Sequence, residues 1–130
     1  ELAGTLTASA RDSPGSGGGA SGGSVFLRAG SFVAAPSAAL FADGGASGNA
    51  DGGGGRIAVW SGVRPADEEA ILSGDPEAVR YPILRGDEAF AYPGTNSAAA
   101  GARSSAPGGD GTVVFLAVAY PPQGTVLVLQ

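Results

Sequence analysis

Any chemistry in this chain would rest mainly on its twelve carboxylates and seven arginines, because it has no histidine, cysteine or lysine. Without histidine it lacks the usual general base and the commonest ligand of transition metals. Without lysine or cysteine it has no Schiff-base nucleophile, no P-loop cation, no thiolate and no disulfide. The composition therefore predicts that the protein is not an enzyme, and that it has no catalytic residues, no cofactor and no metal site.

Two groups of neighbouring carboxylates are the remaining catalytic candidates. Asp67, Glu68 and Glu69 are adjacent at the start of an expected helix, where acidic side chains favour the helix dipole. Asp87 and Glu88 follow an expected turn. Glycoside hydrolases use a pair of carboxylates, but nothing in the sequence separates an acid from a base in these groups. A polysaccharide-degrading enzyme is therefore the last of the alternatives.

Three oxygen-bearing residues are candidates for a calcium site. Asp43, Asn49 and Asp51 share one glycine-rich loop, and such oxygen ligands can hold Ca²⁺. The calcium-binding repeat of β-rolls reads GGxGxD, and the stretch GGASGNAD is one residue too long for it. We interpret the three residues as turn residues that cap backbone groups. Arg56 is expected to flank a strand and to pair with Asp43 or Asp51.

The glycine run Gly52–Gly55 has the composition of a phosphate-binding loop. A Walker loop needs a lysine after its last glycine, and a dinucleotide-binding loop needs a following helix. Here the next residues are RIAVW, a strand pattern. We therefore interpret the run as a structural corner, where glycine lets neighbouring backbones approach closely.

Aromatic side chains are few, and four of them could together form a sugar-stacking platform. These are Trp60, Tyr81, Phe90 and Tyr92. In a chain with so few large side chains, the alternative is that they fill the core. A glycan-binding module that uses Trp60 is the second function we consider.

Length and charge bear on the number of domains and on the kinds of partner. The 130 residues suit one domain over residues 1–130. A net charge of −5 disfavours nucleic acid as a partner, because binding to phosphate needs a basic surface. No apolar run approaches the length of a membrane span.

The chain divides into three zones, and two of them have the composition of β structure. Zones 1–60 and 108–130 alternate short apolar, β-branched runs with glycine clusters, which is typical of strands and turns. Zone 61–107 holds seven of the twelve carboxylates and reads as an irregular acidic excursion.

Within the acidic zone we expect one short helix over residues 64–74. Pro65 suits its first turn and Gly74 its end. Residues 93–109 are expected to be a loop. In the last zone, Pro121 and Pro122 are expected to mark a turn before a final strand over residues 124–130.

Internal repetition is the strongest signal in the sequence. An apolar strand, a glycine-rich turn and a second apolar strand recur, as stacked coils of a parallel solenoid would require. Ser21–Phe32, Ala42–Trp60 and Gly111–Leu129 resemble the glycine-rich repeats of large bacterial surface and secreted proteins. That resemblance implies a right-handed parallel β-helix and an exported structural or adhesive role. We predict an all-β protein, a short right-handed parallel β-helix with one acidic excursion, with a β-sandwich as the alternative.

Both ends of the sequence read as strands with few charges, which leads to a prediction about assembly. A solenoid that ends in a bare coil exposes a strand edge, and such an edge normally needs a cap or a partner. End-to-end assembly of identical chains is the sharpest prediction. The alternatives are that the ends are cut points in a longer solenoid, or that the acidic zone folds back as a cap.

The sequence therefore predicts an extracellular or cell-surface structural subunit or repeat domain. It would build a filament, surface layer or adhesive stalk through stacking of strands and coils. The expected partners are copies of itself or neighbouring repeats, with glycans as a further candidate, and neither nucleic acid nor a membrane span is expected.

Overall fold

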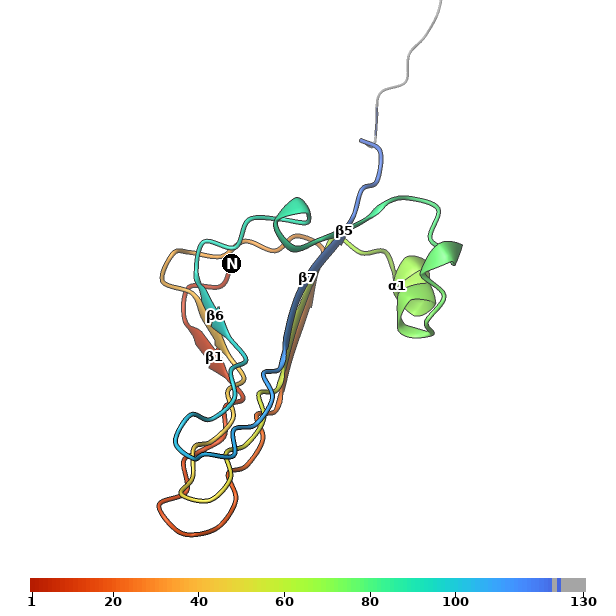
Figure 1. The fold of residues 1–130 in the computed structure, drawn as a ribbon. Helices are drawn as coiled ribbons and strands as arrows, with labels where there is room; N and C mark the ends of the chain where they lie inside the picture. The colour runs from red at the N-terminus through yellow and green to blue at the C-terminus, as the bar shows by residue number, and fades with distance from the viewer. Residues whose placement is uncertain (123, 125–130) are drawn as a thin grey trace, which may run out of the picture.

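Three successive passes of the chain over one path form the body of the protein (Figure 1). The structure is a computed structural model that describes residues 1–122 and 124. The first pass covers residues 2–29, the second 34–62 and the third 95–118. The elements in chain order are β1 (Thr5–Thr7), β2 (Ser24–Ala29), β3 (Ala39–Phe41), β4 (Arg56–Ser61), α1 (Pro65–Leu72), the 3₁₀ helix η1 (Pro76–Ala78), β5 (Ile83–Arg85), the 3₁₀ helix η2 (Gly86–Glu88), β6 (Thr95–Ser97) and β7 (Thr112–Val118).

Two sheets face one another across the core. The first has the strand order β1-β3-β6 and is entirely parallel. The second has the order β2-β4-β7-β5, in which only β5 runs antiparallel to its neighbour. Pairing between passes is one residue to one residue: Thr5 lies opposite Ala39, and Ala39 opposite Thr95. Each pass therefore gives one strand to each sheet.

The core between the sheets is wedge-shaped, wide at one end and narrow at the other (Figure 1). Leu40 of β3 and Ile57 and Val59 of β4 are fully buried between the two sheets. Four aromatic rings pack at the edge of this cluster, and their centroids lie 5.2–6.5 Å apart in the contacting pairs: Phe32, Phe90, Tyr92 and Phe115. A few large side chains thus supply most of the apolar burial.

At the narrow end the two limbs of each pass touch backbone to backbone. The amide of the glycine just before each of β2, β4 and β7 donates to an alanine carbonyl of the opposite limb. The pairs are Gly23 to Ala8 (2.7 Å), Gly55 to Ala42 (2.6 Å) and Gly111 to Ala98 (2.7 Å). A Cβ on Gly52 would lie 2.0 Å from the Ala20 oxygen, and one on Gly54 would lie 1.9 Å from the Ala98 oxygen. Ala20 belongs to the preceding pass and Ala98 to the opposite limb, so these glycines are required by the close approach of both neighbouring passes and opposite limbs.

The helix expected over residues 64–74 is present as α1. Pro65 occupies its first turn together with Asp67 and Glu68, and Gly74 follows its end with φ of 82°. The helix lies outside the body, beyond the four-stranded sheet (Figure 1). Among the described residues, no helix is both long enough and apolar enough to cross a membrane.

The predicted all-β class is wrong, and with it both the parallel β-helix and the alternative β-sandwich. The described chain contains α1, η1 and η2 and has mixed α/β content, and its sheets do not form a closed solenoid. Strand β5 also runs antiparallel to β7. The physical reason lies between the second and third passes, where proline, carboxylates and alanine form helical turns.

The prediction of a loop over residues 93–109 is also wrong in part. Thr95–Ser97 form β6, and this strand pairs with β3 in the third pass. The residues TNS carry no apolar pattern, so only their pairing partner identifies them as a strand. The predicted strand over residues 124–130 falls outside the described residues, apart from Gly124.

Candidate functional site: the open face of the first pass

The first pass leaves the backbone edge of β2 free. Strand β2 is the outermost strand of its sheet, with β4 on its only paired side among the described residues. The amide of Arg56 donates to the carbonyl of Gly23 at the start of β2, and the amide of Gly62 donates to Ala29 at its end. Because bonding alternates along a parallel ladder, the odd residues of β2 face β4 and the even residues face away. The free groups therefore belong to Ser24, Phe26 and Arg28.

Within the part of the chain that the structure describes, β1 also has no partner on this side of the stack. Gly4 accepts from the amide of Ala39, and the amide of Ala8 donates to Phe41. By the same alternation, the backbone groups of Thr5 and Thr7 face away from β3. Every residue of β1 is exposed.

The apolar core is also uncovered at this end of the stack. A hollow of about 230 Å³ opens there. Leu6 is 37% exposed and Val33 is 58% exposed. The apolar residues that line the hollow are Leu2, Leu6, Leu27, Ala29, Phe32 and Val33. We use "the open face" for this hollow together with the free edges of β1 and β2.

The opposite end of the four-stranded sheet is partly covered. There β5 pairs antiparallel with β7, with Ile83 opposite Val118 and Arg85 opposite Leu116. Strand β5 comes from the acidic zone, which thus folds back over this edge, as one of the sequence-based alternatives proposed. The two ends of this sheet are therefore not equivalent.

Residues 1–33, which form most of the open face, carry no net charge by sequence. They hold two arginines, Arg11 and Arg28, and two acidic residues, Glu1 and Asp12. The acidic helix α1 nevertheless lies beside this segment, because Glu68 contacts Arg28 of β2.

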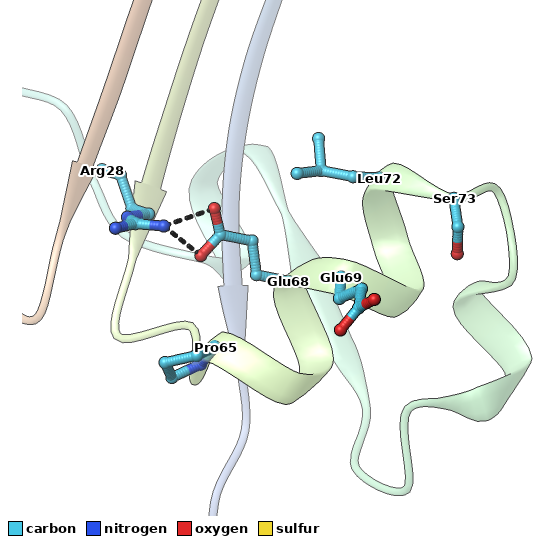
Figure 2. A pocket seen from close by; sticks show the side chains of 6 residues that line it. All are labelled: Arg28, Pro65, Glu68, Glu69, Leu72 and Ser73. Atoms are coloured by element: carbon cyan, nitrogen blue, oxygen red, sulfur yellow. Dashed lines mark hydrogen bonds and ion pairs between the residues drawn. The ribbon is translucent and has the colours of Figure 1, made fainter.

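A groove of about 490 Å³ lies between α1 and the outer face of the four-stranded sheet (Figure 2). Arg28 of β2 reaches Glu68 of α1, and its Nη1 lies 2.5 Å from each carboxylate oxygen. The hydrogen bond from Arg28 to Glu68 and the charge of Glu68 raise the pKa of Arg28. This ion pair ties the helix to β2, and Glu69, Leu72 and Ser73 line the same groove.

The predicted carboxylate groups do not converge on one catalytic site. Glu68 is engaged by Arg28, and Asp67 accepts a hydrogen bond from the Tyr120 hydroxyl. Asp87 and Glu88 lie on η2. Two of the three carboxylates of the first group are thus engaged by other side chains.

The three residues of the predicted calcium site form hydrogen bonds between neighbouring passes: Asp43, Asn49 and Asp51. Asp43 accepts from the Ser97 hydroxyl and from the amide of Ala99 (2.8 Å), and Asn49 donates to the Ser16 carbonyl. Among the described residues, no group of three or more acidic side chains is placed to hold a metal ion. Arg56 forms no ion pair with Asp43 or Asp51 among the described residues, and lines a smaller hollow beside Trp60.

Asp51 is the most strongly bonded carboxylate of this set. Its oxygens accept from the amides of Ser47 (2.8 Å), Arg103 (2.9 Å) and Ser104 (2.7 Å), and from the Ser104 hydroxyl (3.0 Å). Burial raises the pKa of Asp51, but the hydrogen bonds, led by the one from the Ser104 amide, outweigh burial and lower it to about 2. The carboxylate thus joins the second pass to the third.

The four aromatic residues of the predicted sugar platform lie in three separate places. Phe90 and Tyr92 pack against the core, and Tyr81 contacts Tyr120. Trp60 is only 7% exposed, and the ring of Phe26 meets it edge to face at a centroid distance of 5.3 Å. The described residues therefore form no shared aromatic platform.

Comparison with models of known families, with curated proteins and with solved structures finds no match to this chain. The open face thus has to be interpreted from its own geometry. Sequence reasoning singled out none of its residues on β2. The signal was present in SVFLRA, where Phe26 and Arg28 alternate with Val25 and Leu27, but the pattern does not say which neighbour β2 lacks.

Proposed function

We propose that this chain is a structural module that binds another β-structured chain through strand pairing at the open face. One observation carries the proposal: the open face exposes the edges of β1 and β2 and the end of the apolar core together. A strand edge presents unpaired donors and acceptors that template the pairing of a further strand. A partner strand would satisfy these groups and cover apolar surface in the same step.

The side chains around the free edges suit such a partner. Phe26 is 52% exposed on the edge strand itself, and Leu6 and Val33 border the hollow. Natural edge strands are commonly protected by lysine, proline or a covering element. Strand β2 contains neither lysine nor proline, and its one charge, Arg28, is already paired with Glu68.

An extracellular or cell-surface location is part of the proposal. The sequence resemblance to the glycine-rich repeats of bacterial surface and secreted proteins supports it. The absence of cysteine and histidine, and the engagement of Asp67 and Glu68 by Tyr120 and Arg28, support a structural role over an enzymatic one.

Sedimentation velocity over a wide concentration range tests the proposal. We expect the wild-type chain to associate as its concentration rises. Phe26→Pro should abolish association while the monomer stays folded, because the Phe26 amide faces away from β4 and proline removes only that donor from the ladder.

Phe26→Leu is the matched control, because it removes the aromatic ring and keeps the amide. We expect it to associate, with circular dichroism showing that both variants are folded. A wild-type chain that stays monomeric at every concentration, or a Phe26→Pro variant that associates as well as the wild type, would contradict the proposal.

A further inference from the structure

We propose that the partner at the open face is a second copy of this chain, related by a two-fold axis that pairs β2 antiparallel with its own counterpart. The axis passes beside Phe26. This inference rests on the proposed function and names its partner. The result would be a closed pair of chains.

The free backbone groups of β2 fit this symmetry. Ser24, Phe26 and Arg28 all face away from β4 and are spaced two residues apart. With Phe26 opposite Phe26 of the second copy, Ser24 comes opposite Arg28 of that copy. Antiparallel partners that exchange both hydrogen bonds also recur every second residue, so all three residues of β2 with free groups find a partner.

The side chains agree with the same register. On the outer face, Phe26 meets its own copy, and an aromatic pair across strands is favourable. Arg28 faces Ser24 of the second copy, so the two arginines are not placed directly opposite one another. On the core face, Val25 comes opposite Leu27 of the second copy, which extends the apolar layer across the axis.

The unequal ends of the four-stranded sheet favour a pair over a filament. A filament needs head-to-tail contact, in which the open face of one chain stacks on the far end of the next. At that far end β5 already occupies the edge of β7 over Leu116–Val118, so a further chain could not pair along the whole strand. A two-fold contact uses the open face of both chains, and the end that carries β5 takes no part in it.

Because the chain has no cysteine, single cysteines can map the register. Phe26→Cys places two thiols across the axis, at a Cα separation of about 5.5 Å, which a disulfide spans. We expect this variant to form a covalent dimer under mild oxidation. Ser24→Cys is the matched control on the same strand and should not cross-link to itself, because its copy lies four residues away along the ladder.

Amide hydrogen exchange of the wild-type chain provides a readout that needs no substitution. With rising concentration we expect new protection at Ser24, Phe26 and Arg28, while Val25 and Leu27 are protected at all concentrations. Light scattering should give twice the 12.5 kDa chain mass and no larger species.

The outcomes separate this inference from the proposed function. Association with self-linking of Ser24→Cys but not Phe26→Cys, or growth into larger species, would overturn the two-fold pair and leave strand pairing at the open face intact. A chain that stays monomeric, with no new protection at the three amides, would overturn both.

Discussion

At the scale of single residues, the glycines matter because they let backbone segments approach closely. The two limbs of each pass are joined by glycine amides that donate directly to opposite carbonyls. A Cβ on Gly55 or Gly111 would also lie 1.9 or 1.8 Å from a carbonyl oxygen of the neighbouring pass, so a methyl group has no room there. Interiors packed this closely cannot absorb added volume without moving the backbone.

Gly54→Ala is therefore expected to destabilise the protein by about 3 kcal/mol, because the added carbon would meet the Ala98 carbonyl. Urea denaturation followed by circular dichroism measures the change. Gly17→Ala is the control, since a Cβ there meets nothing within 4 Å. Equal stability of the two variants would show that the close approach of the limbs is not required.

Low pH should weaken the contact between the second and third passes, because it protonates Asp51, whose carboxylate bonds the two. Its pKa is about 2 in the folded chain and 3.8 in the absence of these contacts. A carboxyl group with a lowered pKa stabilises the fold above its unfolded pKa, and this contribution is lost as pH falls from about 4 to about 2. The melting temperature should fall over that window, and Asp51→Asn should fall less steeply. Identical pH profiles would assign the acid sensitivity to other groups.

At the scale of elements, the sequence predicted the helix and strands whose own residues favour that structure. Strands β2, β4 and β7 are rich in β-branched and aromatic residues, and α1 begins at Pro65 and ends before Gly74, so the sequence indicated all four. Strand β6 was missed because TNS becomes a strand only through its pairing with β3. Strand β5 was missed as well, because ILR is too short to give a strand pattern within the acidic zone, and nothing in it indicates antiparallel pairing.

The end of α1 offers a test at this scale. Gly74 has φ of 82°, a conformation that costs an L-residue about 1 kcal/mol. Gly74→Ala should therefore lower the free energy of unfolding by about 1 kcal/mol. Gly109→Ala is the control, because Gly109 has no positive φ and a Cβ there meets nothing within 4 Å. A neutral Gly74→Ala would show that α1 ends without need of the left-handed residue.

At the scale of the whole molecule, the sequence predicted that passes stack and that the first strand exposes a free edge, but it did not predict that β2 shares this edge. The recurring glycine-rich turns indicated that chain segments stack closely. Which strand remains unpaired depends on where β5 returns, and that return is a long-range contact without a sequence signature. For this reason the candidate site could not be predicted residue by residue.

Association at the open face predicts that thermal stability depends on protein concentration. A partner that binds only the folded chain stabilises it by mass action. The melting temperature of the wild-type chain should therefore rise with concentration, and that of Phe26→Pro should not. Calorimetric scans at several concentrations measure both, and a wild-type melting temperature independent of concentration would argue against association.

The third pass returns to the register of the second after a much longer detour than separates the first two passes. The ladder between β4 and β7 thus constrains where the detour leaves and rejoins the sheets, while α1 and η1 project from the outer side (Figure 1). The segment contacts the body through β5, through the aromatic residues that enter the core, and through α1, where Glu68 pairs with Arg28 and Ile71 packs against the Trp60 cluster. A foreign peptide grafted in place of α1 would be displayed on a scaffold whose backbone ladder does not depend on it.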